Sequence, residues 1–182
     1  MASNLQEAEV ISMKSIGEGS RVCLDFVDKL QPTEGILVGN TGHGYIMVLA
    51  ENRTTETYPA RPFRVNAGAI HQYAVVDEEK TAYLAELKPG DHVAVMSTEG
   101  YTRKIAIGRV KIEKRSFIRI VVNVDGQEIS ATLQEADSVH LLGHDDTEKQ
   151  AIQLQQGDRI MVRFDQPGRH LGEKIEEEIV EM

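Results

Sequence analysis

Short segments of alternating apolar and polar residues, separated by turn residues, recur about every 8–12 residues along the chain. In the clearest case, Phe117–Val124 has Ile or Val at every second position and is followed by Asp125-Gly126 and a second alternating segment. Asp-Gly between two such segments is a strong β-hairpin signal. No long amphipathic segment with helix caps interrupts the pattern. The sequence therefore predicts a mainly β fold, an antiparallel barrel or sandwich of short strands with few short helices.

Two stretches of the chain resemble each other. Leu87–Val93 reads LKPGDHV and Leu154–Ile160 reads LQQGDRI, and each is expected to form a tight turn that feeds a strand. The similarity indicates either an internal repeat or the recurrence of common turn chemistry. For the domain organisation we expect a tail over residues 1–8 and one β-rich domain over residues 9–182, with a subdivision near residue 88 as an option.

Several local assignments follow from turn and apolar signals. Gly17-Glu18-Gly19 is interpreted as a turn, and Leu30-Gln31-Pro32 as the end of a short helix. Residues 103–112 and Phe117–Val124 are expected to be separate strands. Ala151–Leu154 is expected to pair with a strand at Arg159–Phe164 across the turn at Gly157.

Composition narrows the class of protein. Apolar residues make up 41% of the chain but aromatic residues only 5%, so the core is expected to consist of Val, Ile, Leu and Ala. The net charge of −9 argues against nucleic acid as a partner. The single Cys23 excludes an internal disulfide and fits a cytoplasmic protein. The longest aliphatic run, Tyr45–Ala50, is too short to cross a bilayer, so no membrane partner is expected.

The stretch from Arg61 to Tyr73 is the richest in hydrogen-bond donors. On a strand, Arg64 and Asn66 would share one face, and Val65 with Ala67 would share the other. This pattern indicates either the polar wall of a pocket or a half-buried strand with solvated arginines.

A second cationic region follows. Residues 103–119 contain seven of the 20 Lys and Arg residues but one acidic residue, Glu113. Arg109 and Lys111 share a strand face, so together they are candidates for focusing an anion. There is no Walker loop, Cys-x-x-Cys pair, nucleophile elbow or His-Glu-x-x-His motif, and no metal ligands are assigned. From the residues alone we predict a β-rich domain with a site for a small anion. The candidate residues are Arg61, Arg64, Asn66, His71, Lys80, Arg109, Lys111, Arg169 and His170.

Six segments, in the same order along the chain, resemble the type II 3-dehydroquinate synthases. They are Gly17–Cys23, Glu34–Gly39, Arg61–His71, Lys80–Leu87, Gly108–Glu113 and Gly168–Gly172. The resemblance extends from about Ala8 to the C-terminus. Members of this family are longer and have an N-terminal α/β half. The resemblance therefore also implies that half as a partner. A homo-oligomer is a second option, because exposed β edges favour self-association.

The resemblance implies a reaction in the shikimate pathway of aromatic amino acid biosynthesis. An amino-dideoxy-heptulosonate, a small anionic sugar acid, would undergo NAD-dependent oxidative deamination and then aldol closure to 3-dehydroquinate. Two alternatives are considered. One is a cyclase of the sister branch, which makes 3-amino-4-hydroxybenzoate with the help of a divalent metal. The other is a non-catalytic β module that binds an anionic metabolite or a partner chain.

The resemblance also suggests roles for the candidate residues. Arg61 and Arg64 would bind the substrate carboxylate, and Asn66 would orient a hydroxyl or carbonyl group. Further substrate contacts would come from Arg109, Lys111 and Arg169. His71 or Lys80 would move the proton in deamination or aldol closure. Arg169 and His170 would close over the ligand as a loop, and His170 is counted with His71 and Lys80 as a catalytic residue. Replacing Arg64 by Ala is expected to abolish binding with little loss of stability. No residue is assigned to NAD.

Overall fold

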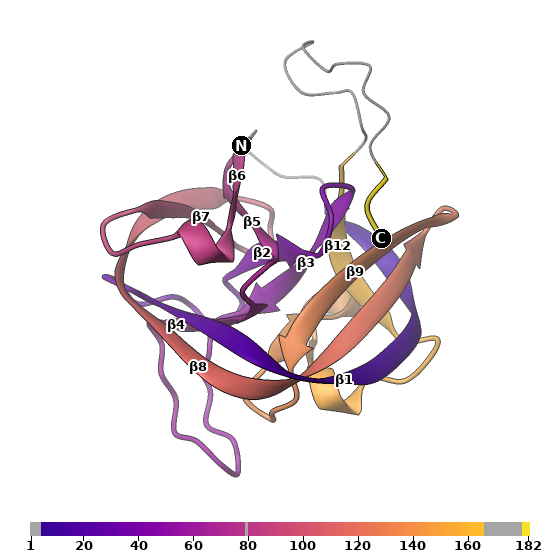
Figure 1. The fold of residues 1–182 in the computed structure, drawn as a ribbon, viewed down its shortest axis with the longest axis horizontal. Coiled ribbons are helices and arrows are strands. Elements are labelled where there is room, and N and C mark those ends of the chain that lie inside the picture. Colours follow the sequence, from indigo (N-terminus) through magenta and orange to yellow (C-terminus); the bar gives the residue numbers. More distant parts are fainter. Residues whose placement is uncertain (1–4, 79, 166–179) are drawn as a thin grey trace.

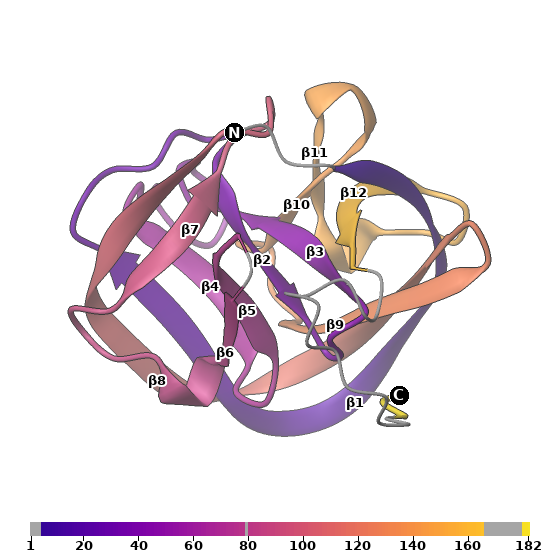
Figure 2. The same cartoon turned by 90° about the horizontal axis from the view of Figure 1, so that it is seen from above.

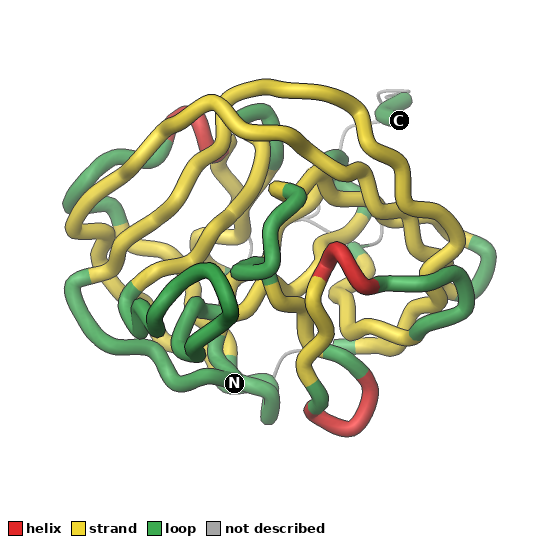
Figure 3. Tube along the Cα trace, turned by 90° about the horizontal axis from the view of Figure 1, so that it is seen from below, coloured by secondary structure: helices red, strands yellow, loops and turns green. Residues whose placement is uncertain are grey.

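The structure, a computed structural model, describes residues 5–78, 80–165 and 180–182. The chain is almost entirely strand and loop (Figure 3), so the prediction of a mainly β, antiparallel fold with few short helices is confirmed. The strands are β1 (Gln6–Phe26), β2 (Gly35–Gly39), β3 (Gly44–Leu49), β4 (Arg64–Ala69), β5 (Tyr73–Asp77), β6 (Lys80–Tyr83), β7 (His92–Met96), β8 (Thr102–Val124), β9 (Gln127–Gln134), β10 (His140–Leu142), β11 (Glu148–Gln150) and β12 (Arg159–Phe164). Three single-turn 3₁₀ helices occur among the described residues, at Leu84–Glu86, His144–Asp146 and Ala151–Gln153.

Two long strands, β1 and β8, organise the sheet. They pair antiparallel from Glu9 with Asn123 to Phe26 with Ile107. Figures 1 and 2 show this two-stranded ribbon running along one side of the molecule, from the group that contains β5, β6 and β7 to the group that contains β9 and β12. The other strands complete one 12-stranded sheet, in the order β11-β10-β3-β12-β1-β8-β7-β2-β5-β6 with β4 on β1 and β9 on β8.

The pairing pattern is internally duplicated. We call Arg64–Met96 the first repeat and Gln127–Phe164 the second repeat. In the first repeat β4 pairs with β1, β5 with β2, and β7 with β8 and β2. In the second repeat β9 pairs with β8, β10 with β3, and β12 with β1 and β3. Each repeat therefore makes the same pairings once β1 is exchanged with β8 and β2 with β3.

The turn before the last strand of each repeat is the same in atomic detail. The amide of Lys88 donates 2.9 Å to the Asp91 carboxylate, and the amide of Gln155 donates 2.9 Å to the Asp158 carboxylate. Gly90 in the first turn has φ of 95°, and its counterpart in the second has 96°. The sequence similarity between these segments therefore reflects an internal repeat.

Aliphatic residues form the core, as predicted. The main cluster includes Leu24, Ile36, Val48, Ile120 and Val162, all fully buried. Strands on both sides of residue 88 pair within one sheet, and the domain boundaries themselves remain a prediction. None of the helices in the described part of the chain is both long and apolar enough to span a membrane.

Some local predictions were wrong. β1 begins at Gln6 with Ala8 fully buried, so the strand includes residues assigned to the tail. Gly17 lies inside β1 at a bulge and not in a turn, because β8 continues to pair with β1 on both sides of it. The two strands expected at 103–124 are one strand, β8, for the same reason.

The two other errors concern single turns. Residues 27–33 contain no helix. Ala151–Gln153 is a 3₁₀ turn and does not pair with β12, whose partners are β1 and β3.

Candidate functional site

Three adjacent strands, β4, β1 and β8, carry ionic and polar residues on the face opposite to the core. Strand register places them in rows. Asp25 lies between Arg64 and Arg109, and Cys23 lies between Asn66 and Lys111. The intervening residues, such as Val65 and Leu24, point into the core. The predicted division of the Arg64 strand into a polar and an apolar face is therefore confirmed for Val65 and Ala67, but Arg64 and Asn66 are buried and not solvated.

Asp25 joins two arginines. Its carboxylate accepts from Arg64 Nε at 2.7 Å and Nη2 at 3.1 Å, and from Arg109 Nε at 2.7 Å. Burial alone would raise the pKa of Asp25, but the hydrogen bonds from Arg64 and Arg109 outweigh it, and the net shift is downward. The carboxylate is therefore ionised near neutral pH and holds both guanidinium groups.

The next part of the network centres on Arg21, which lies two residues before Cys23 in β1 and pairs with Glu113 in β8. Gln134 Oε1 accepts from Arg21 Nη1 at 2.6 Å and from Asn66 Nδ2 at 2.8 Å. Arg21 Nη2 donates 2.6 Å to Glu113, which also lies near Lys111. Residues from four strands are thereby joined in one polar network on this face of the sheet.

Glu51, which lies just past β3, is a further member of the network. Arg61 Nη2 lies 2.8 Å from Glu51 Oε1, an ion pair outside the geometry of an aligned hydrogen bond. Burial raises the pKa of Glu51, against the opposing effect of Arg61, Arg64 and Arg21. Burial likewise raises the pKa of the Cys23 thiol to about 11, so this thiol is not a nucleophile near neutral pH.

Three buried atoms of the network have no hydrogen-bond partner among the described residues, namely Arg21 Nε, Arg61 Nε and Asn66 Oδ1. A fourth, Glu51 Oε1, has no aligned hydrogen bond but takes part in the ion pair with Arg61. Unmatched buried donors and acceptors cost free energy, so native proteins usually satisfy them with water or a ligand. Their concentration in one cluster marks this region as a candidate binding site.

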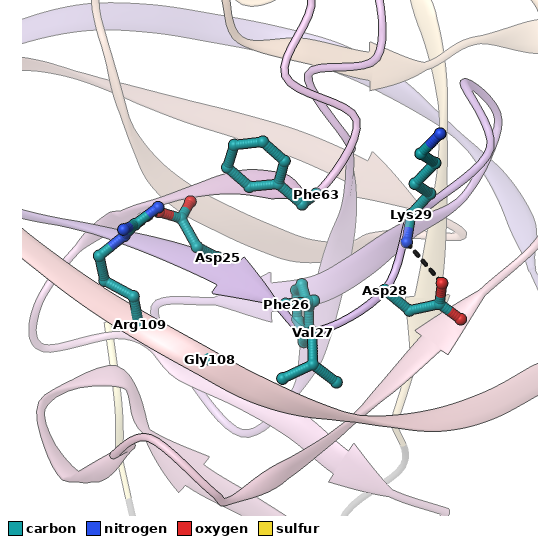
Figure 4. Close-up of a pocket in the computed structure, with 8 residues that line it drawn as sticks. All are labelled: Asp25, Phe26, Val27, Asp28, Lys29, Phe63, Gly108 and Arg109. Atoms are coloured by element: carbon teal, nitrogen blue, oxygen red, sulfur yellow. Dashed lines mark hydrogen bonds and ion pairs between the residues drawn. The ribbon is translucent and has the colours of Figure 1, made fainter.

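An open pocket adjoins the Asp25 row (Figure 4). It has a volume of about 590 Å³ and is lined by Asp25, Phe26, Val27, Asp28, Lys29, Phe63, Gly108 and Arg109. Figure 4 shows the Arg109 guanidinium beside Asp25 at one end of the pocket, with Lys29 and Asp28 at the other. The pocket combines apolar side chains with two cations, Arg109 and Lys29, and two carboxylates, Asp25 and Asp28. Asp25 is already bonded to Arg64 and Arg109, and the exposed guanidinium of Arg109 suits a small molecule that carries a carboxylate.

His71 belongs to a separate, neutral group. Its Nε2 lies 2.8 Å from Asn40 Oδ1, which also accepts from Thr132 Oγ1 at 2.9 Å. Asn40 Nδ2 donates 3.0 Å to Ser130. Partial burial lowers the pKa of His71, which favours a neutral imidazole that can accept a proton.

The structure brings together only part of the predicted site. Arg61, Arg64, Asn66 and Arg109 fall in one network, and Lys111 lies at its edge. Lys80 is exposed at the start of β6, in a different strand pair. The predicted residues Arg169 and His170 lie outside the described residues. The catalytic roles of His71, Lys80 and His170 remain predictions.

Sequence reasoning did not select five members of the network: Arg21, Asp25, Glu51, Glu113 and Gln134. A signal existed for two of them, because Arg21 and Asp25 alternate with Val22 and Leu24 in the strand pattern of β1. Glu51 and Gln134 stand at strand ends, where alternation does not indicate which neighbours they will meet.

Comparison with known proteins decides the family. Residues 7–182 match the family model described as 3-dehydroquinate synthase II C-terminal domain. The chain belongs to this family. A 3-dehydroquinate synthase of Methanothrix thermoacetophila is 42% identical over 178 residues, which is 98% of this chain and 49% of the relative. A 3-dehydroquinate synthase of Archaeoglobus fulgidus is 43% identical over 177 residues, 97% of this chain and 54% of the relative.

The chain thus spans about half the length of the curated 3-dehydroquinate synthases that it matches. No solved structure matches it significantly. The matched region contains all the strands that build the polar network, so the network is part of the 3-dehydroquinate synthase II C-terminal domain.

The described residues of this 3-dehydroquinate synthase domain do not fit a dinucleotide site of the usual kind. Such sites hold the pyrophosphate at the N-terminus of a helix, and the helices in the described ranges are single 3₁₀ turns. In the same ranges, no three His, Cys, Asp or Glu side chains form a group that could hold a metal ion. No chemical step through NAD or a metal is therefore assigned to these residues.

Proposed function

We propose that this chain is the substrate-binding half of a type II 3-dehydroquinate synthase. Together with an N-terminal half it would take part in NAD-dependent oxidative deamination of an amino-dideoxy-heptulosonate and aldol closure to 3-dehydroquinate, in the cytoplasm. The observation that carries the proposal is the arginine-rich network beside an open pocket, within a domain of this family. NAD would be held by the N-terminal half.

Arg109 is the residue best placed to bind the substrate carboxylate. It lines the pocket, its side chain is 61% exposed, and only its Nε contacts Asp25. In the described part of the chain, Nη1 and Nη2 of Arg109 contact no protein acceptor. Two parallel N–H groups on a guanidinium match the two oxygens of a carboxylate. Lys29 adds a second cation within the same pocket.

The remaining arginines support this contact. Arg64 is buried and committed to Asp25, so we assign it to holding this pocket-lining carboxylate and not to direct binding. Arg61, with its side chain 23% exposed, is a second candidate for an anion. The cations of the network outnumber its carboxylates, which favours anionic ligands over neutral ones.

The test is turnover by the two halves together. We expect 3-dehydroquinate and ammonia to form from the amino-dideoxy-heptulosonate and NAD only when the N-terminal half is present. Arg109→Gln should lower kcat/KM about 100-fold, because a charge-assisted, bidentate contact is lost. The control is Arg159→Gln, an arginine of similar exposure on β12, which should change kcat/KM less than about threefold.

Two results would contradict the proposal. One is no turnover by the combined halves, which would favour a non-catalytic module. The other is metal-dependent formation of 3-amino-4-hydroxybenzoate, which would assign the chain to the sister branch. The relatives matched here carry the name 3-dehydroquinate synthase, so that branch is placed second.

A further inference from the structure

Asp25 is the one carboxylate that both lines the pocket and contacts two arginines of the network among the described residues. Its side chain is 4% exposed, so it is itself a poor direct ligand for a substrate. Both of its oxygens are occupied, Oδ1 by Arg64 and Oδ2 by Arg64 and Arg109. A buried, saturated carboxylate of this kind acts on its neighbours and not on a ligand.

The two arginines that share Asp25 differ in their freedom. Arg64 uses Nε and Nη2 on Asp25, and its side chain is mostly buried. Arg109 uses only Nε, and the rest of its guanidinium is open to the pocket. Because a guanidinium is planar, fixing Nε to an immobile acceptor fixes the direction of Nη1 and Nη2 as well. Arg64 in turn immobilises the acceptor.

We propose that Asp25 is a positioning residue, held by Arg64, that orients the terminal nitrogens of Arg109 for bidentate capture of the substrate carboxylate. This inference rests on the proposed function for the identity of the ligand, but the orientation of Arg109 is a property of the chain itself. Without Asp25, an arginine on an exposed strand face would lose rotamer freedom when the substrate binds. With Asp25 present, the arginine side chain loses this rotamer freedom when the chain folds and not when the substrate binds.

Enzyme kinetics with a double-mutant cycle test the proposal. The protein is the two halves together, with Asp25→Asn, Arg109→Gln and both substitutions in this chain. Asp25→Asn should raise KM for the amino-dideoxy-heptulosonate about 10-fold and change kcat less than about threefold, since an amide oxygen is a weaker acceptor than a carboxylate. In the Arg109→Gln background the same substitution should change KM less than about twofold.

The outcome that overturns the proposal is an Asp25→Asn effect on KM that is equally large with and without the Arg109 guanidinium. A purely structural role for Asp25 would produce that result, because a general loss of order does not depend on Arg109. An unchanged KM in Asp25→Asn, with turnover intact and the fold verified by circular dichroism, would overturn it too.

A second measurement needs no substrate. In the chain alone, the ¹⁵N relaxation of the Arg109 Nε–Hε group should report a rigid side chain, and Asp25→Asn should make it as mobile as that of Arg159, whose side chain is 56% exposed. A mobile Arg109 in the unsubstituted chain would overturn the proposal. If turnover is absent but Arg109 is rigid only with Asp25, the proposed function fails and the positioning role stands.

Discussion

β4 and β9 open the first and second repeats and occupy equivalent places in the duplicated fold, but they differ in what they bury on the face opposite to the core. β4 buries Arg64 and Asn66 beside the carboxylate of Asp25. β9 buries Ser130, Thr132 and Gln134, which are neutral, and Gln134 at its end reaches the network of β4. The shared pairing scheme therefore does not determine the chemistry of this face, which is set by the residues at the alternate positions of each strand.

The two faces also differ in whether their buried polar atoms have hydrogen-bond partners. At β9, Asn40 accepts from Thr132 and donates to Ser130. At β4, Asn66 Oδ1 lacks a partner in the described part of the chain, and so do atoms of arginines next to it. Among the described residues, the buried side-chain nitrogen and oxygen atoms of the neutral face all have partners, whereas the ionic face retains atoms without one. The proposed binding site therefore lies at one end of the β1–β8 ribbon.

The largest expected difference between the two faces is the loss of stability when one charged side chain is removed. Arg64→Met leaves the Asp25 carboxylate buried with a single partner, and should lower the free energy of unfolding by about 3–5 kcal/mol. Thr132→Val removes one neutral hydrogen bond at the equivalent strand, and should cost about 1 kcal/mol. Urea unfolding of both variants measures the difference. Similar losses of stability at the two positions would show that the ionic network contributes no more to folding than the neutral hydrogen bonds do.

This expectation differs from the one drawn from the sequence, which was that replacing Arg64 by Ala costs little stability. The alternation of Arg64, Val65, Asn66 and Ala67 correctly identified the polar face. It did not reveal burial, because burial depends on Asp25 lying opposite Arg64, and the β1–β4 register contains an irregularity at Ala67 that the sequence does not indicate. A one-residue shift would have placed other side chains opposite Arg64.

Local signals were reliable where a turn is made by its own residues. Asp125-Gly126 and the turn at Gly90 formed as predicted, with positive φ at the glycines. The length of β1 and β8 was not predictable, because the polar stretch from Glu113 to Ser116 resembles a turn. It stays extended because β1 supplies a partner for each of these residues.

Glycine substitutions test how the two repeats meet. Gly68, in β4, has φ of 92°, and a Cβ there would clash with the backbone oxygen of Thr132 in β9. Gly68→Ala should therefore cost about 3 kcal/mol, the sum of backbone strain and overpacking. Gly90→Ala and Gly157→Ala have similar φ but open space around the Cβ, and should cost about 1 kcal/mol each. Thermal unfolding compares the three.

The substitutions at Gly90 and Gly157 also test whether the two repeats are equivalent. Because Gly90 and Gly157 stand at equivalent turns, their two costs should agree within about 0.5 kcal/mol. A Gly157→Ala cost as large as that of Gly68→Ala would mean that the second turn is constrained by contacts that the first turn lacks, and the equivalence would hold only for the backbone.

The smallest expected difference between the repeats is in their response to acid. His140 in β10 occupies the place of Tyr73 in β5. Burial, with a contribution from the charge of Arg53, lowers the pKa of His140. The unfolded chain therefore takes up a proton at this histidine first, near its ordinary pKa of about 6.5. The stability contribution of the neutral imidazole is complete above that pH and decreases as the pH falls towards the folded pKa.

The free energy of unfolding should therefore decrease between about pH 7 and pH 5.5, and His140→Gln should reduce the slope. Tyr73→Phe should leave the slope unchanged, because a tyrosine does not titrate in this range. His71, whose pKa is also lowered by burial, would account for a smaller residual slope because it is more exposed. An unchanged slope in His140→Gln would mean that the second repeat is no more sensitive to acid at this position than the first.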